Sequence, residues 1–160
     1  MKMFFALLLY NCIFTIIAGL VAGSIIAIIP AKYFQPKNNS LYNELKFEKG
    51  GRVYDKFKIQ RWKDKVPQFS EIVHKGFSKG NLKSINKGYL ERFYLETVRA
   101  EFCHRLLILI SPVFYFVNQN KMWGITFAIL YALGNVPFIM IQRYNRPRIK
   151  KIMDGLKTKK

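Results

Sequence analysis

The sequence is poor in the side chains that most metal and disulfide chemistry needs. Its 160 residues include only two cysteines and two histidines, and they carry 9 acidic side chains against 27 basic ones. Two cysteines cannot form a Cys₄ zinc site or a disulfide-rich scaffold, and two histidines cannot supply a histidine-cluster oxygenase. We therefore expect neither a metal site nor a bound cofactor.

Apolar and charged residues occupy separate parts of the chain. The apolar fraction is 51% and the net charge is +18, yet the mean hydropathy is only +0.03. So high an apolar content excludes a disordered chain, and the length predicts one domain over residues 1–160. A charge of this size is typical of proteins that bind nucleic acid or an anionic membrane.

Three apolar stretches predict an all-α membrane protein with three transmembrane helices. The stretches are residues 3–29, 98–117 and 122–141. The first has no charged side chain and exceeds the roughly 20 residues that span a bilayer core. It is also longer than the apolar region of a signal peptide, so we expect it to be retained. The second stretch reaches spanning length only by including Arg99, Glu101, His104 and Arg105.

The distribution of lysine and arginine predicts the orientation of these spans. Residues 30–92 and 142–160 hold 23 of the 27 basic side chains, whereas the N-terminus and the turn at 118–121 hold two. The positive-inside rule places the loop 30–92 and the tail in the cytoplasm, with the N-terminus outside. The sequence thus predicts a multi-pass membrane protein. Because topology explains the charge, we expect no nucleic-acid partner.

The loop and the tail have different patterns. Between Tyr54 and Val66 the loop alternates aromatic residues with lysine and arginine. This pattern suits a segment lying on an anionic leaflet, and it equally suits a solvated basic loop. After Pro147, apolar residues recur at i, i+3, i+4 and i+7, from Ile149 to Leu156. That spacing predicts a separate C-terminal amphipathic helix at the membrane interface.

Polar residues inside the predicted spans indicate a functional site, because polarity there is costly. Glu101 and His104 lie on one face of the second span. His104 is the natural general base, since its unperturbed pKa is near neutrality, and Glu101 is placed to orient its ring. The structural alternative is that these residues only stabilise helix packing. We assign a further set of polar residues to substrate binding, with the arginines able to hold a phosphate or carboxylate by forked hydrogen bonds. This set is Glu96, Arg99, Asn135, Gln142, Arg143, Asn145, Arg146 and Arg148.

Two segments resemble a known enzyme family. Residues 96–104, Glu-Thr-Val-Arg-Ala-Glu-Phe-Cys-His, and residues 142–148, Gln-Arg-Tyr-Asn-Arg-Pro-Arg, are similar to blocks of bacterial glycosyl-diaponeurosporenoate acyltransferases, which act last in staphyloxanthin synthesis. The resemblance implies a small multi-pass enzyme of the bacterial cell membrane that esterifies the sugar of a glycosylated carotenoid with a fatty acyl group. A membrane glycolipid fits the same chemistry. The chain has no His-x-x-x-x-Asp acyltransferase signature.

The acyl donor is expected at the cytoplasmic surface. Acyl-CoA carries phosphates and acyl carrier protein has an acidic surface, so the basic residues of the loop and tail would attract either of them. The alternative to an enzyme is a small membrane scaffold or regulatory subunit without catalysis. Alanine at His104 discriminates between them, because a scaffold tolerates that change whereas an enzyme loses its product.

Overall fold

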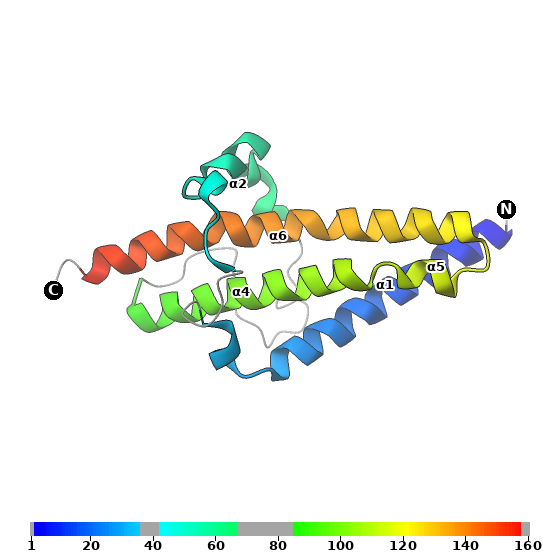
Figure 1. Ribbon diagram of the computed structural model, residues 1–160, viewed down its shortest axis with the longest axis horizontal. Coiled ribbons are helices and arrows are strands. Elements are labelled where there is room, and N and C mark those ends of the chain that lie inside the picture. The colour runs from blue at the N-terminus through cyan, green and yellow to red at the C-terminus, as the bar shows by residue number, and fades with distance from the viewer. Residues whose placement is uncertain (1, 36–41, 67–84, 158–160) are drawn as a thin grey trace. The chain divides into compact units, whose positions relative to one another are not determined.

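The computed structural model describes residues 2–35, 42–66 and 85–157, and these residues form helices and connecting turns without a strand (Figure 1). The predicted all-α class is confirmed for this part of the chain. Residues 36–41 and 67–84 of the predicted loop, and residues 158–160 of the tail, lie outside the described residues. The chain divides into two compact units: unit 1 is Met1–Pro30 with Phe102–Ile139, and unit 2 is Ala31–Glu101 with Met140–Lys160.

Helix α1, Lys2–Ile28, has a largely apolar exposed surface. It ends two residues before Pro30, because the residue that precedes a proline is disfavoured in helical geometry. Large apolar side chains such as Phe5, Leu9 and Ile16 are each at least 61% exposed. A helix with so much apolar surface outside the protein core is unusual in water.

Helices α4 and α5 replace the predicted second span. Helix α4, Lys87–Ile110, begins after Asn86, whose side-chain oxygen accepts a hydrogen bond from the Tyr89 N–H at 2.7 Å. It ends before Pro112, and the short helix α5, Val113–Val117, follows. The prediction of one continuous span over 98–117 is therefore wrong. Proline lacks an N–H and disfavours helical geometry in the preceding residue, which divides this apolar stretch.

Helix α6, Lys121–Lys157, is longer than predicted. The Asn120 side chain caps its start by accepting hydrogen bonds from the N–H groups of Met122 and Trp123. The helix continues through Pro147 for 37 residues, so the prediction of a separate C-terminal interfacial helix is wrong. Burial of Tyr144 and Ile149 on either side of Pro147, at 4% and 3% exposure, favours continuation over a break.

By length and composition, two described helices are able to cross a membrane, rather than the predicted three. They are α1 over Phe4–Ile28 and α6 over Lys121–Leu156. The α4–α5 segment fails this test because its apolar part is interrupted and its first half is charged. Membrane association therefore rests on α1 and α6.

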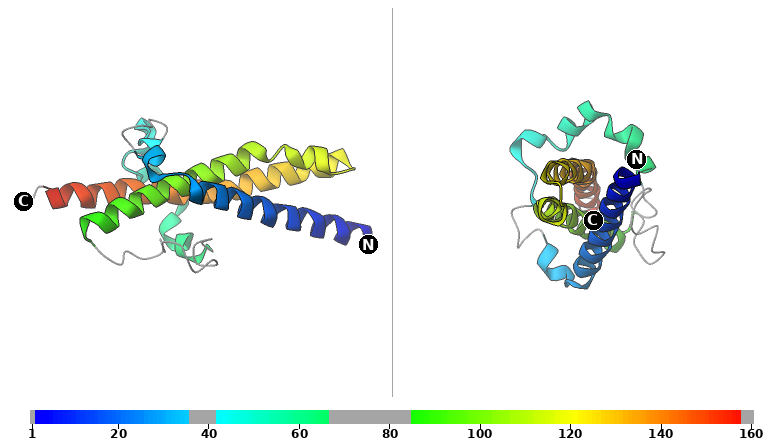
Figure 2. Two further views of the ribbon diagram at one scale, coloured as in Figure 1. Left: turned by 90° about the horizontal axis from the view of Figure 1, so that it is seen from below. Right: turned by 90° about the vertical axis from the view of Figure 1, so that its right-hand side faces the viewer.

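In unit 1 the ribbons of α1, α5 and the first part of α6 reach the same end (Figures 1 and 2). Aromatic contacts and one pair of amides hold these segments together. Asn11 of α1 and Asn118 after α5 donate to each other's side-chain oxygens at 3.0 and 2.9 Å, and both are almost completely buried. Phe14 packs edge-on against Phe114 with ring centroids 4.9 Å apart. A buried amide needs a hydrogen-bond partner, so this pair fixes how α1 pairs with the segment after α5.

Gly124 of α6 permits a close backbone approach within unit 1. A Cβ atom there would lie 2.8 Å from the Phe114 carbonyl oxygen and 2.9 Å from the Tyr115 Cα. These are backbone atoms, which cannot rotate away. In the same helix, a Cβ on Gly134 would meet nothing within 4 Å in the described structure.

We expect Gly124→Ala to destabilise the protein by about 1–3 kcal/mol through overpacking, less the roughly 1 kcal/mol that alanine gains in helix propensity. Gly134→Ala is the matched control and should be neutral or stabilising. Thermal unfolding in detergent, followed by circular dichroism, measures both. Equal melting temperatures for the two variants would contradict the close approach.

Unit 2 contains several short helices before α4. They are η1 Ala31–Phe34, η4 Lys46–Glu48, η5 Arg52–Phe57, α2 Ile59–Trp62 and η6 Lys63–Lys65. Tyr54 and Ile59 from this segment form a buried cluster with Ile141 and Tyr144 of α6. Neither interpretation of the basic, aromatic segment anticipated that part of its apolar face covers a helix. Gly51, with φ of +81°, adopts a conformation that favours glycine and lies where a Cβ would clash with the Arg148 guanidinium.

Candidate active site: a histidine cluster and an arginine cluster

The histidine cluster, His104, Asn135 and Phe138, lies in unit 1. His104 Nδ1 is 2.8 Å from Asn135 Oδ1, and its ring stacks on Phe138 with centroids 4.5 Å apart and an interplanar angle of 15°. Asn135 is buried and its side-chain N–H₂ donates to the Tyr131 carbonyl at 2.8 Å. His104 is half-buried. The imidazole is therefore held on one face and at one nitrogen, as a positioned general base must be.

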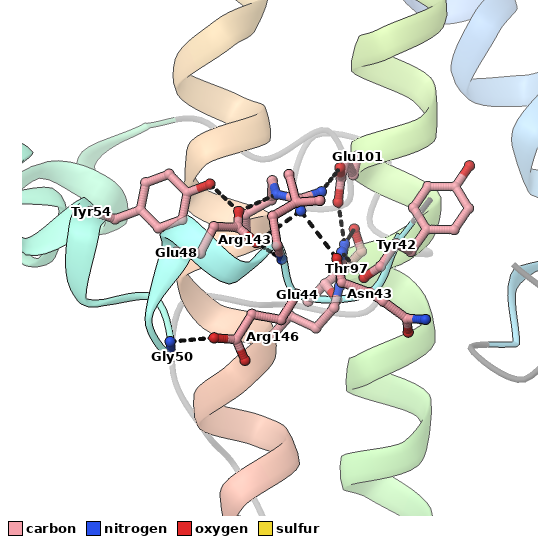
Figure 3. A network of polar contacts seen from close by, with 11 residues as sticks. Tyr42, Asn43, Glu44, Glu48, Gly50, Tyr54, Thr97, Glu101, Arg143 and Arg146 are labelled. Atoms are coloured by element: carbon pink, nitrogen blue, oxygen red, sulfur yellow. Dashed lines mark hydrogen bonds and ion pairs between the residues drawn. The ribbon is translucent and has the colours of Figure 1, made fainter. Parts of the chain in front are cut away.

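The arginine cluster, Glu48, Glu101, Arg143 and Arg146 with Thr97, lies in unit 2 (Figure 3). Arg143 lies between two carboxylates: its Nη2 donates to Glu48 at 2.9 Å and its Nη1 donates to Glu101 at 2.7 Å. Arg143 and Glu101 are 6% and 0% exposed, respectively. Buried charges need such partners, and here one guanidinium neutralises two acids on different elements.

Arg146 completes the arginine cluster. Its Nη2 forms an ion pair with Glu101 at 2.6 Å and donates to the Thr97 carbonyl at 3.2 Å. Its Nη1 donates to the Tyr42 carbonyl at 2.9 Å. The guanidinium is thus bonded to a carboxylate and to two backbone carbonyls. An incoming phosphate would have to compete with these partners.

Glu48 connects the arginine cluster to the η4–η5 segment. Its carboxylate accepts hydrogen bonds from the Tyr54 hydroxyl, from the Leu45 N–H and from Arg143. Burial opposes the charged form, but the hydrogen bonds from Arg143, Tyr54 and Leu45 outweigh it and lower the pKa of Glu48. Burial, together with the adjacent Glu48 carboxylate, raises the pKa of Tyr54 to about 12.

These two shifts predict how stability depends on pH. The folded state depresses the pKa of Glu48 below its ordinary value of 4.5, so the stabilisation is present above pH 4.5 and is lost as the pH falls through the folded value. The pKa of Tyr54 is raised, so its contribution is present below its ordinary value of 10 and is lost as the pH rises toward about 12. The unfolding free energies of the wild type and Glu48→Gln should differ by their full amount above pH 4.5 and converge as the pH falls below it. A constant difference would contradict the role of Glu48.

A pocket borders the arginine cluster within unit 2. Its lining is mostly polar: Tyr42, Asn43, Glu44, Glu48, Tyr94, Arg143, Arg146, Pro147 and Lys150.

Among the described residues, no group of three or more histidine, cysteine, aspartate or glutamate side chains is arranged to hold a metal ion.

The structure brings some of the remaining predicted residues together. Glu96 and Arg99 form an i, i+3 ion pair at 3.1 Å, and Arg99 also lies over the Phe34 ring. Arg148 pairs with Asp55 at 3.0 Å and its side chain is 38% exposed. Gln142 is buried and its Oε1 has no hydrogen-bond partner in the described structure. Asn145 is half-buried on α6.

Sequence reasoning missed several residues that build these clusters. Glu48, Thr97 and Tyr54 were not singled out, although Glu48 is one of only nine acidic residues in a strongly basic chain. Asn11 interrupts an apolar run, and an amide in such a run needs a partner. That signal was present in the sequence, but the identity of the partner, 107 residues away, was not.

Comparison with known proteins identifies the family. The family model described as glycosyl-4,4'-diaponeurosporenoate acyltransferase matches residues 38–155. Proteins of that name from Staphylococcus aureus strains Newman and bovine RF122 / ET3-1 are 36% and 35% identical over 133 residues, covering 82% of this chain and 78% of theirs. No solved structure matches.

Two of the described helices are long and apolar enough to cross a membrane. The chain belongs to the glycosyl-4,4'-diaponeurosporenoate acyltransferase family, as its sequence resemblance implied, and it is therefore an acyltransferase. This membership does not favour the alternative of a non-catalytic scaffold.

Proposed function

We propose that this acyltransferase esterifies a hydroxyl of a membrane-embedded glycosylated carotenoid, or of a similar glycolipid, with a fatty acyl group. The observation that carries the proposal is the hydrogen bond between His104 and Asn135, which holds a base in unit 1. Unit 1 also contains the whole of α1 and the apolar first part of α6. An apolar acceptor embedded in the bilayer is delivered to such a site laterally.

The proposed step balances with His104 alone as the proton carrier. The imidazole accepts the proton of the acceptor hydroxyl while that oxygen attacks the acyl carbonyl carbon of a thioester. The new carbon–oxygen ester bond forms, the carbon–sulfur bond breaks, and the leaving thiolate takes the proton from the imidazolium. Orientation of the two substrates supplies much of the remaining acceleration.

The donor is an acyl-CoA or an acyl carrier protein that approaches from the basic side. Residues 142–160 carry eight lysine and arginine side chains, and residues 30–92 carry fifteen. Such a surface attracts phosphates and acidic proteins electrostatically. Among the arginines that the sequence assigns to substrate binding, Arg148 has the most exposed side chain. We propose that the exposed basic residues of these two segments attract the donor. Arg143 and Arg146 instead neutralise the buried carboxylates of Glu48 and Glu101.

The membrane arrangement that fits places the N-terminus and residues 118–120 outside, with the tail in the cytoplasm. Helices α1 and α6 begin at the same end of unit 1, because Phe4 packs on Trp123 with centroids 5.7 Å apart. Residues 102–117, at the end of α4 and through α5, run in the opposite direction and lead to the start of α6. The positive-inside rule then orients the pair.

Cysteine labelling tests this arrangement. With the native Cys12 and Cys103 replaced by serine, Gln119→Cys should react with a membrane-impermeant maleimide from outside intact cells. Lys151→Cys should react only after the cells are opened. Labelling of both positions from outside would contradict the topology. The serine background without added cysteine is the control.

The reaction itself is tested by lipid analysis. Cells that make the glycosylated carotenoid, with and without this chain, are extracted and the lipids compared by mass spectrometry. We expect the mass of the glycoside to increase by the mass of one fatty acid minus one water. An acylated glycolipid with unchanged carotenoid would shift the acceptor to that lipid, and no new ester in either fraction would refute the proposed function.

A further inference from the structure

The contacts of Asn135 decide which nitrogen of His104 carries a proton. The Asn135 N–H₂ donates to the Tyr131 carbonyl at 2.8 Å, so the amide oxygen is the atom that lies 2.8 Å from His104 Nδ1. An amide oxygen only accepts, so Nδ1 must donate and therefore carries the proton. In the neutral ring the lone pair then belongs to Nε2.

The local surroundings make this tautomer persistent. Asn135 is only 6% exposed, and a flip of its amide would break the bond to Tyr131 and place two N–H groups against His104. Phe138 stacks on the imidazole at 4.5 Å and restricts its rotation. Asn135 and Phe138 are three residues apart on α6, so one helix face supplies both contacts.

The partner of His104 Nδ1 is uncharged. Residues 1–30 and 102–139, which form unit 1, contain no aspartate or glutamate. Glu101, the preceding acidic residue on α4, is ion-paired with Arg143 and Arg146. An asparagine can orient an imidazole much as the third member of a Cys-His-Asn arrangement does.

We propose that Asn135 is the positioning residue of this enzyme: its amide oxygen holds His104 in the Nδ1–H tautomer and so makes Nε2 the basic nitrogen. The inference rests on the proposed function, in which His104 is the base. In this proposal Asn135 is a positioning residue and not a substrate ligand. Its assignment to substrate binding from the sequence is thereby replaced by a role that acts through His104.

A double-mutant cycle tests the inference in reconstituted vesicles containing the glycosylated acceptor and an acyl thioester. Asn135→Leu keeps the size but loses the acceptor atom, and we expect it to lower kcat by roughly 10- to 100-fold with both KM values within about threefold of the wild type. Asn135→Asp retains an oxygen acceptor and should recover most of that loss. Combining Asn135→Leu with His104→Gln should cost no more than His104→Gln alone, because a positioning residue has no effect without the residue it positions.

The controls separate this role from a merely structural one. Thr126 is exposed on the same helix and its hydroxyl binds the Met122 carbonyl of its own turn, so Thr126→Val should leave kcat unchanged. The activity is normalised to folded protein, measured by thermal unfolding in detergent. Multiplicative losses in the double variant, a raised KM with normal kcat, or full activity of Asn135→Leu would each overturn the inference. An inactive wild type would instead refute the proposed reaction.

Discussion

His104→Gln should fold, insert into the membrane and lose at least about two orders of magnitude of acyl transfer, because a positioned general base typically contributes about 10²–10⁴ in rate. Glutamine retains much of the size of the imidazole, and its amide is able to donate toward Asn135, but it cannot accept and release a proton. The loss should appear in kcat rather than in KM. Turnover of a thioester donor in vesicles, normalised to folded protein, measures it.

Three outcomes of this experiment point to different mechanisms. A loss of 100-fold or more with a normal melting temperature supports the base role. Near-normal transfer by well-folded His104→Gln excludes it and leaves orientation of the two substrates as the main source of acceleration. Loss of folded protein would indicate packing on Phe138 as the dominant contribution, and His104→Phe, which retains a stacked ring, would then restore the fold but not the activity.

The helices that could be predicted are those determined by local sequence. The 27-residue α1 follows from a long apolar run without a charged side chain and ends before Pro30, as expected. The division at Pro112 was also available from the sequence, because proline breaks a helix, but the requirement for spanning length favoured one continuous span. Pro147 shows the opposite case, in which burial of its neighbours on α6 outweighs the local preference for a break.

The candidate site was predictable as a set of residue types but not as a set of pairs. Glu101, His104 and Asn135 were all singled out, because polar side chains in apolar stretches indicate function. The partners depend on contacts across the fold: Arg143 and Glu48 are 95 residues apart, and His104 and Asn135 are 31 apart. One sequence holds no information on such pairs beyond charge complementarity. For that reason the sequence alone led us to interpret the buried arginines as ligands of the acyl donor.

Arg143 gives the sharpest test of that interpretation. Replacing it with methionine keeps the aliphatic stem but leaves Glu48 and Glu101, which are 2% and 0% exposed, without their shared cation. Removing one partner of a buried ion pair costs about 3–5 kcal/mol, because the remaining charge stays desolvated. The η4–η5 segment should also separate from α6, since Arg143 bonds both Glu48 and the Asn43 carbonyl.

We therefore expect Arg143→Met to lower the unfolding free energy by about 3–5 kcal/mol, whereas Arg148→Met, the matched control, should cost less than about 1 kcal/mol. Arg148 carries the same charge on the same helix, but its side chain is 38% exposed and its partner Asp55 is 50% exposed. Adding Glu48→Gln to Arg143→Met should recover part of the loss, because it removes the buried carboxylate that has lost its cation, whereas Glu101 still pairs with Arg146. Chemical unfolding in detergent, followed by circular dichroism, measures all three variants. The opposite result would be an Arg143→Met variant that is as stable as Arg148→Met but whose acyl transfer no longer depends on donor concentration. The buried guanidinium would then bind the donor and would not stabilise the fold.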